Sequence, residues 1–460
     1  MYLKKVTLRN IKCFSNLELD FAPNSKPRMW TAILGENGLG KSTLLQAIGA
    51  ALAGPGAMRE LLPVAEGWVH RGQPYGEIEA ELLWTDGDAQ TPHWPKYTPY
   101  IARYIVTGDD PERLPATLAE QYTIPTLVEW SGEGPSKQRE RITRDMNRLK
   151  QTAYAENKPG WFACGYGPFR RLSGGSQDAD RILYSGRKSA RFVTLFREDA
   201  ALTNATDWLI SLYNTAKDED YASKRALEQV KSALVMDIFL QPAELQVNAR
   251  SALLKIGSQT PVPFRDLSDG YRSMLALSID LLRWMTVSFP ETDDLRVNRG
   301  VVLIDELDAH AHPAWQRKMG HWLRHKFPNL QFIVATHSPF LAQVADPGGN
   351  IVLEQKADGV NVRDDVESVE TWRADQIFTD LFDLPTTRSP EVELKIERLQ
   401  SLRQKRQAQK LSPEDEKDYE QLRLWSESIP PAIEDPVERK FALSLQSAVD
   451  RQSDRIRELQ

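Results

Sequence analysis

A short segment near the start of the chain carries residue types that bind phosphate groups. Residues 35–43 read GENGLGKST and match the pattern G-x-x-x-x-G-K-[ST]. Glycines in such a loop let main-chain N–H groups turn towards phosphate oxygens, and the following helix N-terminus adds partial positive charge. On the order of 0.01 accidental matches are expected in a chain of this length, so the segment predicts nucleotide binding. The predicted contacts are Gly35, Asn37, Gly38, Gly40, Lys41, Ser42 and Thr43.

Within this loop, two side chains have individual roles. Lys41 is expected to reach the β- and γ-phosphates, where its charge also serves catalysis, and the Ser42 hydroxyl is expected to ligate Mg²⁺. The predicted cofactors are therefore ATP and Mg²⁺.

A pair of carboxylates far along the chain complements the loop. Residues 301–306 read VVLIDE, a buried strand that delivers Asp305 and Glu306 to the carboxyl edge of a sheet. We expect Asp305 to be the second magnesium ligand and Glu306 to orient and deprotonate the attacking water. The alternative is an acidic strand end without a role.

About thirty residues later, another apolar run ends in a histidine. Residues 335–339 read ATHSP, which places His337 at a neighbouring strand end. We expect His337 to contact the γ-phosphate as a further catalytic residue, whereas a lone histidine is more often structural.

A fourth segment, residues 267–272 (LSDGYR), precedes an apolar helix over 274–282. The pattern predicts that Ser268 caps this helix and that Gly270 lets a phosphate approach the main chain. By spacing alone, an ordinary helix N-cap is the alternative.

Hydrophobic patterning indicates the elements that position these residues. Short apolar runs predict strands, and Gly54-Pro55-Gly56 is expected to end the helix that follows the phosphate loop. The polar stretch 107–159 is interpreted as an inserted arm or helical subdomain. The expected strands cover 3–8, 29–34, 77–84, 301–304 and 331–335, and the expected helices cover 44–52, 200–213 and 223–235.

Composition narrows the class of protein. The 460 residues suggest roughly three structural units. A net charge of −6 excludes a uniformly basic nucleic-acid coat, and the two cysteines, Cys13 and Cys164, exclude a disulfide framework. Neither a signal peptide nor an 18-residue apolar stretch is found, so we expect a cytoplasmic protein that does not contact a membrane.

Taken in order, the four segments resemble an ABC-type ATPase head of the RecF/SMC-like branch (AAA-type, and OLD-like without the nuclease). The resemblance implies an α/β fold, an ABC-type P-loop ATPase head with a mixed central sheet, a helical insertion and a helical C-terminal tail. It makes residues 267–272 the signature loop, Asp308 the D-loop residue and His337 the switch histidine. It also implies a head-to-tail homodimer or higher homo-oligomer, in which Ser268 and Gly270 of one chain complete the partner's phosphate site.

The same resemblance extends to the N-terminus and divides the chain. Residues 8–14 (LRNIKCF) resemble the opening segment of this branch, which places Arg9 near the nucleotide. Gln73 and the loop 165–171 are the two candidates for the Q-loop position. The expected parts are 1–106 and 251–365 for the two halves of the head, 107–250 for a helical insertion with a Gly-aromatic loop at 161–176, and 366–460 for a helical tail that either docks a partner or packs on the core.

Residues 162–170 (FACGYGPFR), 266–272, 308–313 and 374–391 carry a narrower likeness, to the ATPases of Septu-type and retron-associated anti-phage systems. This likeness implies a nucleotide switch that controls a separate HNH-type nuclease, since no nuclease pattern occurs after His337. The alternatives are a RecF-like DNA-binding ATPase of repair or recombination, and a scaffold with a structural nucleotide. The basic runs 139–148 and 395–410 are interpreted as solvated helix faces, with a DNA path across the dimer as the alternative.

Overall fold

The computed structural model divides into two compact units, Met1–Asp383 and Leu384–Gln460. All the sequence-predicted site residues belong to the first unit. Composition predicts that the tail starts at residue 366, and residues up to Asp383 belong to the first unit. The structure describes residues 1–85, 88, 99–120, 122–129, 136–156, 158, 160–170, 176–202, 205–218, 220–234, 243–357, 359–363, 366, 368–384, 386–408 and 410–427.

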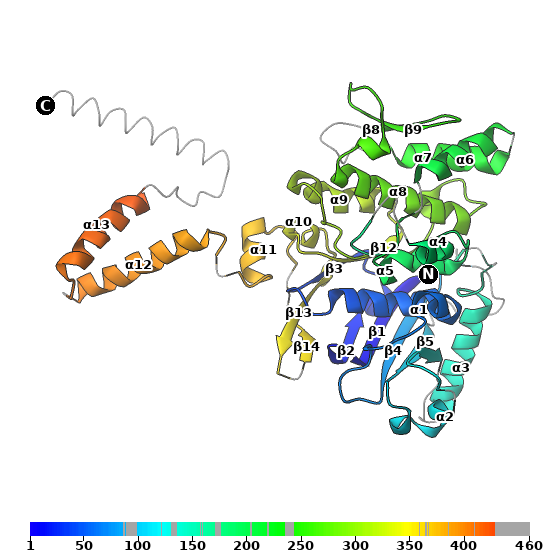
Figure 1. Cartoon of the computed structure of the whole chain (residues 1–460), viewed down its shortest axis with the longest axis horizontal. Helices are drawn as coiled ribbons and strands as arrows, with labels where there is room; N and C mark the ends of the chain where they lie inside the picture. Colours follow the sequence, from blue (N-terminus) through cyan, green and yellow to red (C-terminus); the bar gives the residue numbers. More distant parts are fainter. Residues whose placement is uncertain are drawn as a thin grey trace. The chain divides into compact units, whose positions relative to one another are not determined.

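A six-stranded mixed sheet forms the centre of the first unit (Figure 1). Its order is β14-β13-β3-β12-β11-β7, in which the N-terminal strand β3 lies between strands from the far end of the unit. Neighbours from β13 to β7 are parallel, and β14 is antiparallel to β13. The strands span Trp30–Leu34 (β3), Ala163–Tyr166 (β7), Gly300–Ile304 (β11), Leu330–Ala335 (β12), Asn350–Lys356 (β13) and Gly359–Val362 (β14).

A second sheet is antiparallel, with the order β2-β1-β4-β5-β6. It shares one hydrophobic cluster with helix α1 and with one face of the central sheet, to which Ile33, Leu303 and Ile333 contribute. Because strand side chains alternate between faces, Ala32, Val302 and Val334 belong to a second cluster with α8 and α9. These elements span Tyr2–Ile11 (β1), Phe14–Asp20 (β2), Tyr75–Leu83 (β4), Tyr100–Thr107 (β5), Leu127–Glu129 (β6), Lys41–Leu61 (α1), Asp269–Ser288 (α8) and Pro313–Lys326 (α9).

Helix α1 is interrupted where its sequence predicts. The element runs to Leu61, but it consists of two helical stretches joined across a kink, so the first stretch ends at Gly54-Pro55-Gly56 as expected. Gly54 is non-helical, with φ 84°. Pro55 has no N–H for the carbonyl of Ala51, four residues earlier. The Tyr154 hydroxyl donates to that carbonyl at 2.6 Å and so supplies a hydrogen-bond donor at the kink.

The segment 107–250 holds helices, as expected, but it also contributes strands to both large sheets. Helix α3 (Ser136–Gln151) packs against β5 and buries Ile142, Met146 and Leu149 in the cluster of the antiparallel sheet, and β7 completes the central sheet. Helices α6 (Ala205–Lys217) and α7 (Tyr221–Ala233) pack on each other. A three-stranded sheet of Ala243–Val247 (β8), Ala252–Ile256 (β9) and Val262–Pro263 (β10) adjoins α6.

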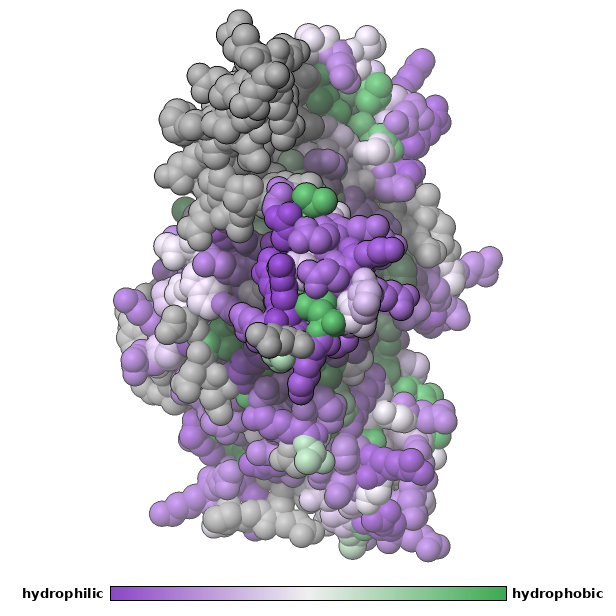
Figure 2. Space-filling model, turned by 90° about the vertical axis from the view of Figure 1, so that its left-hand side faces the viewer, coloured by the Kyte–Doolittle hydropathy of each residue, from purple (hydrophilic) through white to green (hydrophobic). Residues whose placement is uncertain are grey.

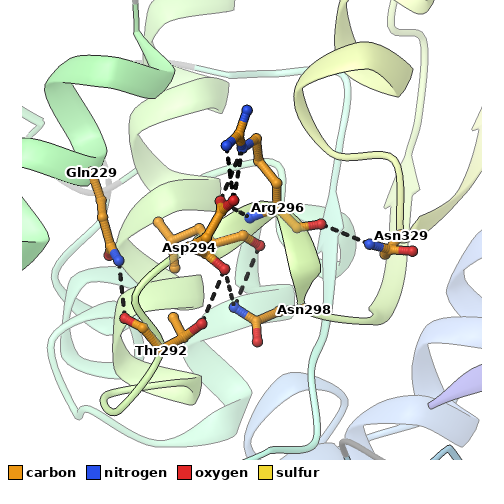
Figure 3. A network of polar contacts seen from close by, with 7 residues as sticks. Gln229, Thr292, Asp294, Arg296, Asn298 and Asn329 are labelled. Carbon is orange, nitrogen blue, oxygen red and sulfur yellow. Dashed lines mark hydrogen bonds and ion pairs between the residues drawn. The ribbon is translucent and has the colours of Figure 1, made fainter.

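A polar network fixes the connection that leads into β11 (Figure 3). From α7, the Gln229 amide donates to the carbonyl of Thr292 at 2.9 Å. The Thr292 hydroxyl donates to the carbonyl of Asp294, whose carboxylate pairs with Arg296. Asn329, just before β12, donates to the carbonyl of Arg296 at 2.8 Å. The network thus connects α7 to the starts of two central strands.

In the second unit, the described residues form a helical hairpin of α12 (Pro390–Gln407) and α13 (Pro413–Glu427). Leu399, Leu402 and Tyr419 form its small core, and Arg398 pairs with Asp415 and Asp418. Residues 428–460 of the expected tail lie outside the described residues.

Hydrophilic residues dominate the face drawn in Figure 2, and the hydrophobic ones occur there in small separated groups. Among the described helices, none combines the length and the apolar character that crossing a membrane requires. The remaining short elements are η1 (Pro23–Ser25), η2 (Pro111–Arg113), α2 (Ala116–Ala119), α4 (Gln177–Leu183), η3 (Lys188–Phe192), α5 (Val193–Phe196), η4 (Phe264–Asp266), η5 (Leu295–Val297), α10 (Pro339–Ala342) and α11 (Ala374–Asp380).

Candidate functional site

The phosphate loop joins β3 to α1, the arrangement that its sequence predicts. Gly40 precedes the helix with φ 86°, a conformation that favours glycine. A Cβ atom at this position would lie 2.4 Å from the Cys13 sulfur, on the turn between β1 and β2. The antiparallel sheet therefore supports the loop from outside, and only glycine fits this contact. Gly38 also has a positive φ, of 85°.

The ammonium group of Lys41 lies inside the loop. It donates to the carbonyls of Gly35 and Glu36, both at 2.8 Å. Burial lowers the pKa of Lys41, whereas the carboxylates of Asp305, Glu306 and Asp308 raise it. These electrostatic contacts place the two predicted halves of the site beside each other.

Asp305 follows β11 and is only 3% exposed. Its Oδ1 atom is buried without a hydrogen-bond partner among the described residues. Burial raises the pKa of Asp305, while a hydrogen bond with the Ser42 side chain lowers it. A hydroxyl beside an unsatisfied carboxylate oxygen is the donor set that Mg²⁺ prefers, so Ser42 and Asp305 fit the predicted metal.

Glu306, the predicted base, has a left-handed backbone with φ 47°. This conformation costs a residue with a side chain about 1–2 kcal/mol. The buried guanidinium of Arg170 donates to the carbonyls of Asp305 at 2.9 Å and of Glu306 at 2.8 Å. Burial lowers the pKa of Arg170 to about 10, which leaves it charged at neutral pH. These charge-assisted hydrogen bonds stabilise the unfavourable turn.

His337 lies just beyond β12, the strand between β3 and β11. Its Nε2 atom is buried without a hydrogen-bond partner among the described residues. Burial lowers the pKa of His337 and the Lys41 ammonium lowers it further, whereas Asp308 and Glu306 raise it. Asp308 accepts a short hydrogen bond from the hydroxyl of Thr336, which joins the two neighbouring strand ends.

The segment at the start of α8 differs in detail from its expectation. Ser268 occupies the N-cap position, but its side chain makes no capping hydrogen bond, so the prediction that it caps the helix is wrong. Ser268 and Asp269 are exposed, whereas Gly270 is buried. A Cβ atom on Gly270 would lie 2.6 Å from the Trp315 ring and 2.8 Å from the carbonyl of His310. Packing within the chain therefore already requires a glycine there.

The other predicted residues take varied positions. Asn37, Gly38 and Ser42 are exposed, whereas Gly35 and Thr43 are buried. The exposed side chain of Arg9 forms an ion pair with Glu77 on the neighbouring strand β4, and its proximity to a nucleotide stays a prediction.

Of the two Q-loop candidates, Gln73 is exposed in a turn before β4. The loop after Tyr166 follows β7, the strand that pairs with β11. Arg171, the last residue of that candidate loop, lies outside the described residues.

The sequence pattern of residues 162–170 predicts no individual role for Arg170. Its signal is a Gly-Pro turn followed by an arginine directly after a strand. Among the described residues, it is the cation that contacts the main chain of both predicted carboxylates.

The chain is similar in sequence to known families and proteins. Residues 117–343 match the family described as "AAA domain, putative AbiEii toxin, Type IV TA system", and residues 5–79 match "AAA domain". The Septu protein PtuA of Bacillus mycoides (strain KBAB4) is 25% identical over 385 residues, which cover 83% of this chain and 44% of that protein. The Retron Vc95 probable ATPase of Vibrio cholerae serotype O1 biovar El Tor is 30% identical over 131 residues, which cover 28% of this chain and 25% of that protein.

Among solved structures, an Smc head bound to the C-terminal winged-helix domain of ScpA gives a TM-score of 0.48 at 14% identity, with 79% of this chain and 97% of that chain covered. The chain spans less than half the length of either curated relative. The two family matches include the phosphate loop, the paired carboxylates and the switch histidine position. The chain therefore matches AAA-domain families in two segments and is similar to the Septu protein PtuA and to a probable retron ATPase.

Proposed function

We propose that this chain hydrolyses ATP and acts as a nucleotide switch. The observation that carries the proposal is the convergence of Lys41, Asp305, Glu306 and His337 from three adjacent strands of one sheet. Each of these residues has the chemistry that phosphoryl transfer requires, namely a cation on the phosphates, a metal ligand, a base and a γ-phosphate contact.

The chemistry follows from the side chains. Main-chain N–H groups of the phosphate loop and the Lys41 ammonium bind the β- and γ-phosphates. Ser42 and Asp305 would hold Mg²⁺, whose charge offsets that of the phosphates. Glu306 accepts a proton from the attacking water, and His337 contacts the γ-phosphate through the Nε2 atom that has no partner among the described residues.

ATP would join two heads in a head-to-tail dimer. The exposure of Ser268 and Asp269 supports this arrangement, because both are accessible to a nucleotide held by another copy. Hydrolysis at Glu306 would then separate the heads. The differential contacts of the ATP state would drive a partner between inactive and active forms.

We further propose that the partner is a separate nuclease of the HNH type and that the pair acts in anti-phage defence. The likeness to the Septu protein PtuA over most of this chain supports this role.

Replacing Glu306 with glutamine tests the switch. We expect phosphate release to fall by about 10²- to 10⁴-fold while ATP binding persists. Light scattering in ATP should then show a lasting dimer. The exposed Glu112→Gln on η2 is the matched control and should hydrolyse ATP like the parent. Equal turnover by Glu306→Gln and the parent would show that Glu306 is not the base.

Affinity purification of both forms from the native host tests the partner. A stoichiometric nuclease, retained or lost with nucleotide state, would support the defence role. Nucleic acid without a protein partner would favour a RecF-like repair ATPase.

A further inference from the structure

Arg170 uses its whole hydrogen-bonding capacity inside the protein. The Nε atom donates to the Ser273 hydroxyl at 3.1 Å. One terminal nitrogen donates to the carbonyls of Gly167 and Asp305, and the other donates to those of Glu306 and Leu307. An arginine has five N–H donors, and five acceptors surround this one.

These partners are unusual for a buried cation. The side chain is 6% exposed, and all of its hydrogen-bond partners are neutral oxygen atoms. An apolar side chain would be enough to fill this volume. A buried charge is unfavourable unless it is well compensated, so packing alone does not explain an arginine here. The charge is explained by its task of holding several main-chain carbonyls in one orientation.

Three of those carbonyls are consecutive, from Asp305 through Leu307. Glu306, the middle residue, is the one with the left-handed backbone. A side chain leaves the Cα atom in a direction that φ and ψ determine, so the orientation of the Glu306 carboxylate depends on this turn. Arg170 therefore acts on Glu306 and Asp305 through their main chain.

The same loop also contacts α8. Ser273 lies in the first turn and a half of this helix, just after Gly270. Tyr166, at the end of β7, donates to the carboxylate of Asp280 further along α8, and its carbonyl accepts from the Asp305 N–H at 2.8 Å. Residues 166–170 thus form a bridge between the paired carboxylates and the helix that begins at the exposed segment 267–270.

We propose that Arg170 is a positioning residue, which sets the turn of Asp305 and Glu306 and connects that turn to α8 through Ser273. The inference rests on the proposed function, since it assigns Glu306 its geometry for water activation. It also predicts that a movement of α8 changes the orientation of the Asp305 and Glu306 carboxylates.

The first test replaces Arg170 with lysine. A lysine ammonium has three donors at one point and cannot hold four carbonyls and a hydroxyl. We expect the kcat for ATP hydrolysis to fall by about 10- to 100-fold, with the Kd for a fluorescent ATP analogue at saturating Mg²⁺ nearly unchanged. The Mg²⁺ concentration that half-saturates nucleotide binding should rise by about 10-fold, because the Asp305 main chain loses its support.

Arg191→Lys is the matched control, because Arg191 is also buried but donates to the carbonyl of Trp161, away from this turn. It should lose thermal stability without a change in kcat. If Arg170→Lys keeps the parental kcat and magnesium requirement, the inference is wrong. Such a result would show that positive charge alone is sufficient at this position.

The second test removes only the connection to α8. Ser273→Ala should lower kcat by about 3- to 10-fold, the effect of one hydrogen bond, with nucleotide affinity retained. Ser278→Ala is its control, since the Ser278 hydroxyl bonds within the same helix, to the carbonyl of Met274. Equal kcat values for both serine variants would exclude the connection through Ser273.

Ser273→Ala also reports on the inference if Arg170→Lys does not fold, because it changes one small side chain. If the parent binds the nucleotide but releases no phosphate, the proposed hydrolysis is wrong. The inference is then tested by the Mg²⁺ concentration that half-saturates nucleotide binding to Arg170→Lys. A higher concentration than for the parent would support the positioning of Asp305 by Arg170, and an equal one would overturn the inference.

Discussion

Gly40 sits where a phosphate loop meets a second sheet. The contact with Cys13 leaves no room for a Cβ atom, and the backbone conformation disfavours one. We expect Gly40→Ala to destabilise the protein by about 2 kcal/mol or more without nucleotide present. Gly56→Ala in the same helix is the control, because a Cβ atom there meets nothing within 4 Å. It should be neutral or stabilising by up to about 1 kcal/mol. Urea denaturation measures both, and equal stabilities would refute the argument.

His337 gives a pH dependence of stability. Its native pKa lies below the ordinary value of 6.5 because of burial and the Lys41 ammonium. The unfolded chain therefore binds a proton on His337 at a higher pH than the native protein. The stabilisation is complete above pH 6.5 and is lost as the pH falls towards the native pKa. Over that interval, His337 contributes a slope of at most about 1.4 kcal/mol per pH unit.

The comparison variant is His337→Asn. Denaturation between pH 8 and pH 5 should show a shallower loss of stability for this variant than for the parent. Parallel curves would mean that the pKa of His337 is the same in both states.

Most of the site could be predicted from residue types and spacing. The phosphate loop, Asp305, Glu306 and His337 follow apolar runs that read directly as strands, so their meeting at one sheet edge could be inferred. The role of Arg170 could not be predicted, because its partners are mostly main-chain carbonyls. Every residue has such a carbonyl, so residue types do not show which ones accept a hydrogen bond. The role of Gly270 was also incomplete, since the Trp315 ring that covers it lies far along the chain.

Among the elements, the kink of α1 at Gly54 is accompanied by a hydrogen bond from one tyrosine. The Tyr154 hydroxyl donates to the carbonyl of Ala51, which Pro55 cannot reach with an N–H. We expect Tyr154→Phe to lose about 1–2 kcal/mol of stability, because that carbonyl loses its partner. Tyr184→Phe is the control, since Tyr184 is 60% exposed. Thermal unfolding compares the two, and an unchanged Tyr154→Phe would show that the bend needs no such donor.

The Gly-Pro-Gly signal correctly predicts the kink of α1, whereas the contact of Tyr154, about a hundred residues away, could not be predicted from local sequence. Strand β7 is likewise not predictable from its own residues. Its four residues, ACGY, form too short a run to show a pattern, and their pairing with β11 decides their conformation.

For the whole molecule, the division after Asp383 leads to a further prediction. Every predicted site residue and both large hydrophobic clusters lie before this point. A chain ending at residue 383 should therefore fold and bind ATP within about twofold of the full-length affinity. Calorimetric titration of both forms measures this. An insoluble or non-binding product would show that the second unit completes the fold.

The increase in charge after residue 365 predicts a tail that starts there. Within this segment, Val369, Ile377 and Leu381 pack into the cluster with α8. Charged residues surround these apolar ones, so composition alone does not reveal that packing.

The strand order has a consequence for how the protein is made. Strand β3, at residues 30–34, pairs with β12 and β13, which end at residues 335 and 356. At 5–20 residues per second, a ribosome needs about 15–60 s to synthesise the roughly 300 residues between them. During that time, an apolar strand destined for the middle of a sheet has no partner. The nucleotide site therefore assembles only when nearly the whole first unit has left the ribosome, and until then the apolar strand β3 stays unpaired in the nascent chain.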